Sequence, residues 1–305
     1  MKPSVGVVIP TRGERPELLA AAVAGVLDQE YGRRIRVVVV VDGGGDALGP
    51  AEQIADVVAA TRGSVRVVAN RRARGLPGAR NTGIDELDTD LVAFCDDDDR
   101  WLPGKLAAQV AALEGEPEAD FASCAIEVAY GSRLVPRQAG AERVTRADLT
   151  RSRMVMVHSS TFLFRASAGY RADESAPGGQ NEDWDLALRA AARHPIVHVD
   201  RPLVRVRWGG SGYVARWADR IAGLEWMLAR HADLETDPRG AARIYGQMAF
   251  HHAALGRRRD AGRWAWKAFS AHRREPRAAV ALAVATGLVP ARAVLGLLHT
   301  CGRGI

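Results

Sequence analysis

The sequence is poor in the features that mark several classes of protein. It has only three cysteines in 305 residues, Cys95, Cys124 and Cys301, and they lie far apart. An odd, widely spaced set fits neither a disulfide framework nor a zinc site, so we expect core thiols. No run of 18 apolar residues occurs, which argues against a membrane-spanning helix. The first residues lead directly into a strand-like segment without a signal-peptide pattern, so the sequence predicts a cytoplasmic protein.

Lysine is also scarce, because only Lys2, Lys105 and Lys267 accompany a large set of arginines. The positive charge is uneven along the chain. Residues 216–305 hold 15 Lys and Arg against 7 Asp and Glu, a net charge of +8 in a chain whose total is +6. A basic C-terminal part allows contact with a polyanion or with the inner face of a membrane, but does not require it.

Two common phosphate-binding motifs are absent from the sequence. The pattern G-x-x-x-x-G-K-[ST] does not occur, and Pro10-Thr11-Arg12-Gly13 after the first apolar run lacks the glycine spacing of a dinucleotide fingerprint. A nucleotide bound here would need another device to neutralise its phosphates. A metal ion held by carboxylates is the obvious candidate.

The most distinctive feature is a run of four carboxylates, Asp96, Asp97, Asp98 and Asp99, which we name the acidic run. Adjacent like charges repel one another, so a fold that holds them at a strand end favours a cation or a cationic partner. The alternative is a solvated loop or a helix cap, which is the commoner use of aspartate runs. A strand-like segment before the run and Trp101 after it favour a rigid corner.

Strand-like and helix-like segments alternate along the first part of the chain. Apolar runs predict strands at residues 5–10, 35–41, 65–69, 91–95, 120–130 and 154–165, and helical spacing predicts helices at 16–27 and 51–60. This alternation indicates an α/β fold with a parallel sheet. Ligands of such sheets bind beyond the carboxyl ends of the strands. Polar residues follow four of these runs: Thr11 and Arg12, Asp42, Asn70, and the acidic run.

These motifs together resemble the family 2 glycosyltransferases of the GT-A fold. The matching stretches are Val7-Val8-Ile9-Pro10-Thr11-Arg12, Asp42-Gly43-Gly44, Gly75 with Ala79-Arg80-Asn81-Thr82-Gly83-Ile84, residues 93–103, and Glu182-Asp183-Trp184-Asp185-Leu186-Ala187-Leu188-Arg189. The last is similar to the family's E-D-x-x-L-x-x-R element. The resemblance implies a Rossmann-like, mostly parallel mixed sheet flanked by helices, with residues 1–215 as the catalytic domain.

The resemblance also implies an inverting, metal-dependent transfer from a nucleoside-diphosphate sugar, with UDP- or dTDP-sugars favoured. Asp183 would be the general base, and Glu182 would help to position the acceptor. Asp98 and Asp96 would hold Mn²⁺ or Mg²⁺, with the choice among the four aspartates open by one position. The implied nucleotide-sugar contacts are Pro10, Thr11, Arg12, Glu14, Asp42, Arg80, Asp96, Asp97 and Trp208.

Simpler readings of two of these features remain open. Arg80 could be an arginine on a helix surface, and acidic residues at 182 and 183 could serve only as favourable charges in a first helical turn. At the level of function, the alternatives are a nucleotidyltransferase acting on a sugar phosphate and a non-catalytic scaffold. The acceptor hydroxyl is left open among a glycan, a lipid-linked glycan, a natural product and a peptide.

Residues 216–305 are expected to be helical only. Helical hairpins are predicted at 241–255, 260–272 and 276–288, with a weak similarity to tetratricopeptide helix pairs. One such unit is too short for a repeat array, so packing on the catalytic domain is the more ordinary role. Residues 289–298 form an amphipathic end that is suited to a peripheral membrane contact or to a homodimer. Nucleic acid is not an expected partner, because the basic residues lack interleaved aromatic platforms.

Overall fold

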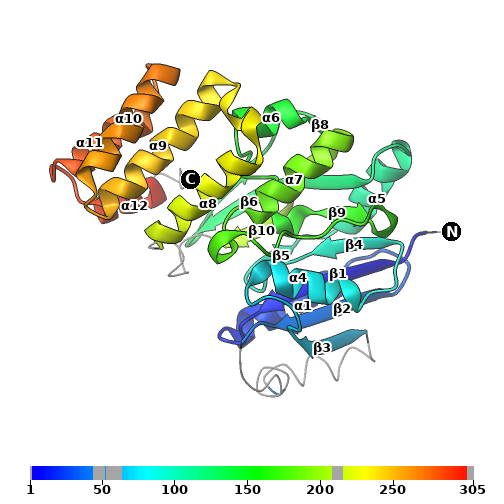
Figure 1. Cartoon of the computed structure of the whole chain (residues 1–305). Helices are drawn as coiled ribbons and strands as arrows, with labels where there is room; N and C mark the ends of the chain where they lie inside the picture. The colour runs from blue at the N-terminus through cyan, green and yellow to red at the C-terminus, as the bar shows by residue number, and fades with distance from the viewer. Residues whose placement is uncertain (1, 44–51, 53–63, 208–215, 301–305) are drawn as a thin grey trace. The chain divides into compact units, whose positions relative to one another are not determined.

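The computed structural model of the protein describes residues 2–43, 52, 64–207 and 216–300 (Figure 1). It divides into two compact units. The first, which we name the sheet unit, comprises Met1–Thr145, Val155–Glu174 and Glu182–Arg207. The second, which we name the helical unit, comprises Arg146–Met154, Ser175–Asn181 and the described part of residues 208–305. The helical unit thus includes two short segments that precede the boundary expected at residue 215, which itself stays a prediction.

Within the described residues, ten strands of the sheet unit form one mixed sheet. The strands are β1 (Val5–Thr11), β2 (Ile35–Val41), β3 (Val65–Ala69), β4 (Leu91–Phe94), β5 (Arg100–Trp101), β6 (Phe121–Tyr130), β7 (Arg133–Arg137), β8 (Arg143–Val144), β9 (Leu163–Arg165) and β10 (Ile196–Arg207). Their order is β3-β2-β1-β4-β9-β6-β10-β5, with β7 paired to β6 and β8 to β10. The pairs β1–β2, β2–β3, β1–β4 and β6–β10 are parallel, whereas β9 is antiparallel to β4 and β6.

The centre of this sheet follows directly from the apolar runs. All seven residues of β1 are buried, as expected for a Val- and Ile-rich strand that pairs with a parallel neighbour on each side. Phe94, Phe121, Phe164 and Tyr170 pack edge-on or stacked around the β4–β9–β6 junction. The predicted α/β class with a mostly parallel mixed sheet is confirmed.

Helices accompany the strands in the sheet unit. They are α1 (Pro16–Leu27), α4 (Leu76–Asp85), α5 (Lys105–Gly115) and α7 (Glu182–Arg193), with short 3₁₀ turns η1 (Ser159–Thr161) and η2 (Ala166–Ala168). Helix α4 lies against β1 so closely that a Cβ added at Gly83 would overlap the Val8 side chain. The helix expected at 51–60 lies outside the described residues, apart from Glu52.

The strand predicted at 154–165 is wrong over most of its length. Only Leu163–Arg165 pairs in the sheet, and Ser159–Thr161 forms a 3₁₀ turn. The reason is local hydrogen bonding, because the Ser160 amide donates to His158 Nδ1 (3.2 Å) and the Thr161 hydroxyl donates to the His158 carbonyl (2.7 Å). Such side-chain bonds satisfy backbone groups that a strand would have used.

The helical unit contains only helices among its described elements. They are α6 (Arg146–Arg151), η3 (Pro177–Gly179), α8 (Trp217–Arg230), η5 (Ala232–Glu235), α9 (Pro238–Ala254), α10 (Arg258–Ala271), α11 (Pro276–Ala285) and α12 (Ala291–Thr300). Alanines form the core between α9, α10 and α11: Ala249, Ala265, Ala268, Ala278 and Ala281. Small side chains let the helices approach closely, and the helical C-terminal region predicted from the sequence is confirmed. No helix in the described part of the chain is both long and apolar enough to cross a membrane.

Candidate active site

The acidic run occupies the corner between β4 and β5. The Asp99 amide donates to the Asp96 carbonyl (3.1 Å), which closes a tight turn, and β5 starts one residue later. Buried Trp101 anchors the far side of this corner, because its Nε1 donates to the Ser160 carbonyl (3.0 Å). The corner is therefore rigid, as the flanking sequence predicts, and the solvated-loop alternative is wrong for this run.

The four carboxylates alternate between solvent and interior. The side chains of Asp96 and Asp98 are 22% and 24% exposed, whereas those of Asp97 and Asp99 are 9% and 3% exposed. Asp97 and Asp98 are the two central residues of the turn, so the turn and the groups around it set this alternation. A ligand approaching from solvent therefore meets Asp96 and Asp98 first.

The two inner carboxylates are held by hydroxyl groups from other elements. The Thr11 hydroxyl at the end of β1 donates to Asp97 (2.6 Å), and the Ser160 hydroxyl donates to Asp99 (2.6 Å). Burial raises the pKa of Asp97 to about 6, with Thr11 and Arg15 acting in the opposite direction. Burial raises the pKa of Asp99 well above its ordinary value, and the charges of Asp96 and Asp98 add to this shift.

The two outer carboxylates face cationic partners. Asp98 pairs with Arg15, whose guanidinium also donates to Asp97 (2.6 Å). Asp96 accepts from Arg80 Nη2 (2.7 Å) and from the Ser159 hydroxyl (2.9 Å). Burial acts to raise the pKa of Asp96, but Arg80 and then His158 outweigh it, so this pKa is lowered. Two arginines thus offset part of the negative charge of the acidic run, one at Asp96 and one at Asp97 and Asp98.

Arg80 is a buried link between two parts of the site. It lies on α4 and is almost completely inaccessible to solvent, so the reading of Arg80 as a surface residue is wrong. One terminal nitrogen contacts Asp96 and the other contacts Glu182 at the start of α7. Residues 16 and 102 positions away in the chain therefore share one guanidinium. This contact joins the acidic run to the Glu182-Asp183 pair.

The Glu182-Asp183 pair forms the first turn of α7, and both residues are buried. Burial raises the pKa of Glu182 above its ordinary value; the Arg80 guanidinium opposes this shift, and the Asp183 charge adds to it. Asp183 Oδ1 accepts from the Trp184 amide (2.8 Å). Farther along the helix, Arg189 pairs with Asp185 (2.9 Å).

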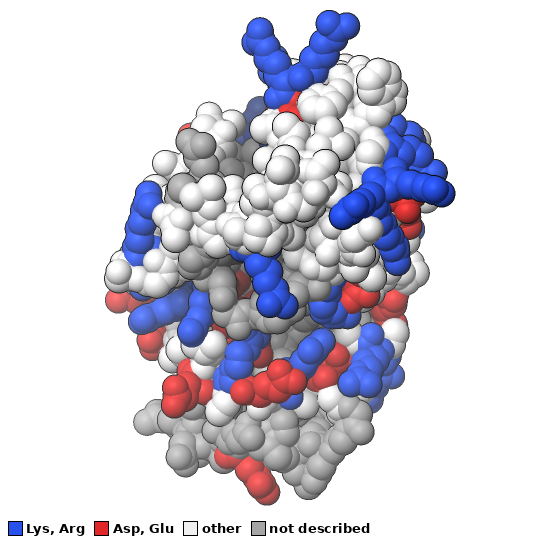
Figure 2. Space-filling view, turned by 90° about the vertical axis from the view of Figure 1, so that its left-hand side faces the viewer, with Lys and Arg blue, Asp and Glu red and all other residues white. Residues whose placement is uncertain are grey.

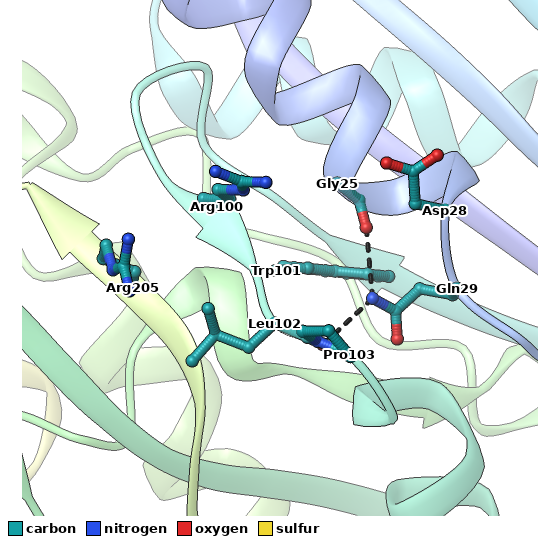
Figure 3. A pocket seen from close by; sticks show the side chains of 8 residues that line it. All are labelled: Gly25, Asp28, Gln29, Arg100, Trp101, Leu102, Pro103 and Arg205. Carbon is teal, nitrogen blue, oxygen red and sulfur yellow. Dashed lines mark hydrogen bonds between the residues drawn. The ribbon is translucent and has the colours of Figure 1, made fainter.

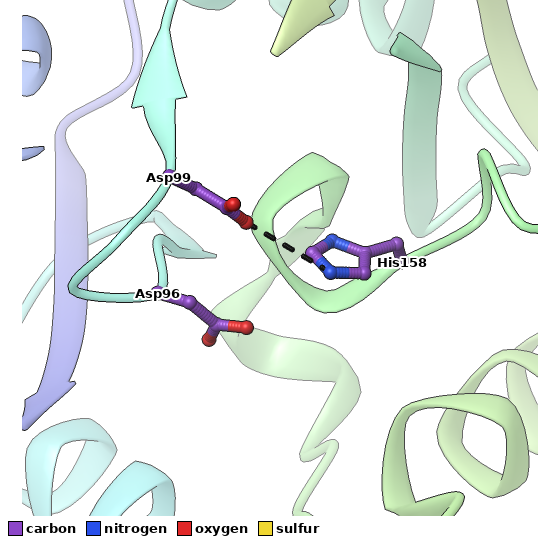
Figure 4. Close-up of side chains that lie close together, drawn as sticks. All are labelled: Asp96, Asp99 and His158. Carbon is purple, nitrogen blue, oxygen red and sulfur yellow. Dashed lines mark ion pairs between the residues drawn. The ribbon is translucent and has the colours of Figure 1, made fainter. Parts of the chain in front are cut away.

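His158 joins the acidic run from the η1 turn (Figure 4). Its Nε2 lies 3.8 Å from Asp99 Oδ2, and ligand atoms of Asp96, Asp99 and His158 all fall within 4.8 Å of one another. His158 Nδ1 accepts from the Ser160 amide (3.2 Å), so Nε2 is the ring nitrogen that faces Asp99. With Asp96 and Asp99, His158 offers a third group that could join a metal site.

The donor set suits a hard divalent cation. Carboxylate oxygens are the ligands that Mg²⁺ and Mn²⁺ prefer, and the acidic run provides four carboxylates in one tight corner. The two outer ones, Asp96 and Asp98, are the ones that solvent reaches. The side chains present therefore fit such an ion.

The other residues predicted to contact a nucleotide sugar lie at several places. Pro10 is buried within β1, and Arg12 and Glu14 are exposed in the turn that follows. Asp42 follows β2 and accepts from Asn70 Nδ2 (2.8 Å) and the Gly75 amide (2.9 Å), so it organises the loop before α4. Trp208 lies outside the described residues.

A pocket of about 240 Å³ lies behind the corner (Figure 3). It is lined by Gly25, Asp28, Gln29, Arg100, Trp101, Leu102, Pro103 and Arg205. Gln29 crosses it and donates to the carbonyls of Gly25 (3.1 Å) and Leu102 (3.0 Å). No predicted site residue lines this pocket, so it is separate from the acidic run's own surroundings.

Sequence reasoning missed the partners that hold the site. Arg15, His158, Ser159 and Ser160 were given no role, although all four contact the acidic run. The three residues of the η1 region are about sixty positions away from it in the chain. The only available signal was the His-Ser-Ser-Thr stretch, whose polar side chains fit poorly in a buried strand.

Comparison with known proteins identifies the family. The model of the family described as glycosyl transferase family 2 matches residues 6–172, more than half of the chain, so the protein belongs to this family. One relative is the amylovoran biosynthesis glycosyltransferase AmsB of Erwinia amylovora, 27% identical over 199 residues, which are 61% of this chain and 64% of AmsB. In two curated relatives the matched stretch is 31% and 64% of the relative's length, so the chain spans less than two thirds of either.

Solved structures show the same fold. One is TarS of S. aureus, residues 1–349 in complex with UDP-GlcNAc, with a TM-score of 0.57 and 13% sequence identity. The match covers 93% of this chain and 91% of the TarS chain. The mannosyltransferase PcManGT from Pyrobaculum calidifontis, in complex with GDP-Man and Mn²⁺, has a TM-score of 0.55 at 21% identity, covering 99% and 81%. The GT-A fold expected from the sequence is confirmed.

Proposed function

We propose that the protein transfers a sugar from a nucleoside-diphosphate sugar to an acceptor hydroxyl, with inversion at the anomeric carbon. The observation that carries this proposal is the buried Arg80, which contacts both Asp96 of the acidic run and Glu182 beside Asp183. A transfer with inversion needs a base on the acceptor side and charge neutralisation on the leaving-group side. The shared guanidinium keeps these two functions at one site.

Asp183 is the proposed general base. In an inverting transfer the base removes the proton of the acceptor hydroxyl as its oxygen bonds to the anomeric carbon, and the sugar–phosphate bond breaks. The electron pair of that bond leaves with the nucleoside diphosphate. Glu182, fixed by Arg80, positions the start of α7 and with it the Asp183 carboxylate.

Asp96 and Asp98 are the proposed ligands of a divalent cation, Mn²⁺ or Mg²⁺. Their greater exposure supports this choice among the four aspartates. When bound, such an ion neutralises negative charge on the leaving diphosphate. Arg15 pairs with Asp98 in this structure, so its guanidinium is the group that an ion at Asp98 would replace or join.

A nucleotide-sugar donor is supported by the complexes of two structural neighbours, one with UDP-GlcNAc and one with GDP-Man and Mn²⁺. These neighbours carry different bases, so the preference for UDP- or dTDP-sugars stays a prediction. The acceptor, the role of Trp208 and the contacts of the helical unit with a membrane or a second copy also stay predictions. A peripheral position at the inner membrane face belongs with them.

The test of the base is Asp183→Asn, which keeps the side-chain shape and removes its basicity. We expect transfer to fall roughly 10²- to 10⁴-fold, the usual range for losing a general base. Binding of the nucleoside diphosphate with Mn²⁺, measured by calorimetry, should stay close to that of the wild type. The anomeric configuration of the product, read by NMR, tests inversion.

A matched control is Asp185→Asn in the same helical turn. Asp185 is completely buried and paired with Arg189, so its carboxylate does not reach a substrate. This variant should be less stable but should retain transfer at reduced temperature. Equal activity of Asp183→Asn and the wild type would refute the base assignment.

The reaction products separate this proposal from the nucleotidyltransferase alternative. A glycosyltransferase releases a nucleoside diphosphate, whereas a nucleotidyltransferase releases pyrophosphate. Removal of divalent cations with EDTA should abolish transfer, and addition of Mn²⁺ or Mg²⁺ should restore it. Full transfer after exhaustive chelation would contradict the metal requirement.

A further inference from the structure

The outer end of the helical unit exposes large apolar side chains. Leu288, in the turn between α11 and α12, is 80% exposed, and Leu297 on α12 is 65% exposed. Trp266 on α10 is 74% exposed. We name Leu288, Leu297 and the turn between their helices the α11–α12 corner. Exposed leucine and tryptophan at this level are unusual on one small unit and point to a partner.

The same end of the unit carries three exposed arginines. Arg257, Arg258 and Arg259 lie where α10 begins, next to the cluster of Ala253, Ala261 and Ala285 that joins the end of α9, the start of α10 and the end of α11. Residues 256–300 as a whole carry nine Lys and Arg residues. The only carboxylates in that stretch are Asp260 and Glu275, which pair with Arg263 (3.3 Å) and Arg277 (2.8 Å). In Figure 2 the upper part, over the α10–α11 end, is mostly white, with Lys and Arg at its edges and little Asp or Glu.

We propose that the α11–α12 corner and the arginines around it bind the surface of an anionic lipid bilayer. Moving leucine and tryptophan side chains from water into the boundary between headgroups and acyl chains lowers the free energy of the system. Arginines next to them are attracted to headgroup phosphates, each contributing to an attraction that salt weakens. Leu288 lies in a turn and is exposed, so it can insert between lipid headgroups without a change in the helices on either side.

Charge decides between a bilayer and a second copy of the chain. A homodimer through this end would bring two arginine-rich surfaces together, with no unpaired carboxylate in residues 256–300 to offset them. Such like-charge contact opposes association. An anionic bilayer offers both negative charge and an apolar layer, and so matches both properties of this end.

The experiment measures binding of the full chain to sedimenting vesicles. Vesicles of phosphatidylcholine alone are compared with vesicles containing about 30% phosphatidylglycerol, a composition that gives a negative surface. We expect about tenfold tighter binding to the anionic vesicles, and loss of most of this difference at about 0.5 M NaCl. The double variant Leu288→Asp/Leu297→Asp should bind the anionic vesicles at least about fivefold more weakly.

The matched control is Leu134→Asp, which places a charge on an exposed leucine of β7 in the sheet unit, 43% exposed. It should bind vesicles like the wild type. A second variant, Arg257→Glu/Arg258→Glu, changes charge near the corner without touching the leucines and should reduce binding at low salt. Circular dichroism checks that each variant is folded, so this second variant still tests the proposal if the first does not fold.

Four outcomes would overturn the proposal. The first is equal binding to neutral and anionic vesicles. The second is an equal loss of binding in Leu134→Asp. The third is a dimer in light scattering that Leu288→Asp/Leu297→Asp dissociates, because the corner would then be an interface between copies of the chain. Tight binding to a DNA duplex without binding to vesicles would likewise assign the basic surface to a nucleic acid.

Discussion

At the scale of single residues, Arg80 stabilises the site by neutralising two buried or half-buried acids. Removal of one partner from a buried ion pair leaves an uncompensated charge, which typically costs about 3–5 kcal/mol. We therefore expect Arg80→Met to lower the free energy of unfolding by about that amount, measured by urea denaturation. The double variant Arg80→Met/Glu182→Gln should recover part of the loss, because Glu182 then carries no charge.

The Arg80 prediction has a clear contrary outcome. If Arg80→Met lowered the free energy of unfolding by less than about 1 kcal/mol, the ion pairs of Arg80 with Asp96 and Glu182 would contribute as little as exposed ion pairs do. No recovery in the double variant would mean that Glu182 is not the acid that Arg80 stabilises. Either result would weaken the role of this contact in joining the two halves of the site.

Lys105 is a second charged side chain that is completely buried. Its Nζ donates to Gln109 Oε1 (2.7 Å) and lies 3.8 Å from the centre of the Trp101 ring. Gln109 in turn donates to the Thr161 carbonyl (2.7 Å), so Lys105 supports both Trp101 and the η1 turn. Burial lowers the pKa of Lys105 from 10.5 to about 8, with the Cys124 and Cys95 thiols acting in the opposite direction.

This shift predicts a pH-dependent stability with a definite sign. Between pH 8 and 10.5 the unfolded chain holds a proton on Lys105 that the folded chain has lost, so the free energy of unfolding rises with pH. Below pH 8 the full penalty, about 3 kcal/mol, is present. Relative to Lys105→Met, the wild type should therefore gain stability in urea denaturation as the pH rises through this window.

The control for Lys105 is Lys267→Met, which removes an exposed lysine of α10 and reports the effect of the chemical change alone. Comparison of each variant with the wild type at matched pH cancels the titration of the other groups. A wild-type minus Lys105→Met difference that stays constant across the window would show that the amine keeps its proton when buried.

At the scale of elements, the contact of α4 with β1 sets the position of Arg80. Gly83 has no room for a Cβ against Val8, and both residues are buried. Gly83→Ala should push α4 away from the sheet and lower the free energy of unfolding by roughly 1–3 kcal/mol, the usual cost of overpacking. Thermal or chemical denaturation measures the loss.

Two further variants sharpen the Gly83 prediction. Gly262→Ala on α10 meets no atom within 4 Å, so it should gain roughly 0.5–1 kcal/mol from helix propensity. Gly83→Ala combined with Val8→Ala should lose less than the sum of the two single changes, because Val8 is the side chain that the new methyl group meets. Strict additivity would show that another neighbour limits the position of α4.

At the same scale, the sequence predicts elements well where one periodicity dominates. The strands around Val7, Val39 and Val67 lie in continuous apolar runs, and the parallel sheet follows from their alternation with helices. The His158 region fails because its structure depends on side-chain bonds to its own backbone, which an apolar count ignores. The edge strand β5 has only two residues, which is too short for a periodic pattern of apolar residues.

The candidate site shows the same division. Asp96, Asp98 and Asp183 could be named from the motifs, whereas their supports come from distant segments that only the fold brings close. Arg15 faces Asp98 from 83 positions earlier in the chain. No spacing rule connects such residues, because their proximity is a property of the sheet order.

At the scale of the whole molecule, the two units interleave along the chain. Arg146 belongs to the helical unit, where it donates to Asp233 (2.6 and 2.8 Å), and a Cβ added at Gly240 would overlap the Thr150 carbonyl. A chain cut after residue 215 would keep Arg146 and Thr150 but lose those partners. We expect this fragment to aggregate or to be digested readily by protease. Size-exclusion chromatography and limited trypsin digestion would measure these two effects.

A shorter truncation serves as the control. Removal of residues 291–305 deletes α12 and leaves the alanine core of α9, α10 and α11 complete. This chain should keep the oligomeric state of the full chain and its helical circular dichroism. A cooperative, protease-resistant fragment 1–215 would show that residues 146–154 and 175–181 do not depend on the later helices.

The tight turn of the acidic run has a consequence for how this corner can change by insertion or deletion. One residue added between Asp96 and Asp99 would lengthen the turn that the Asp99 amide closes on the Asp96 carbonyl. Asp97 and Asp99 would then shift relative to Thr11 and Ser160, the two hydroxyl donors that hold them from other elements. The length of this turn is therefore as strict a requirement as the identity of any single aspartate.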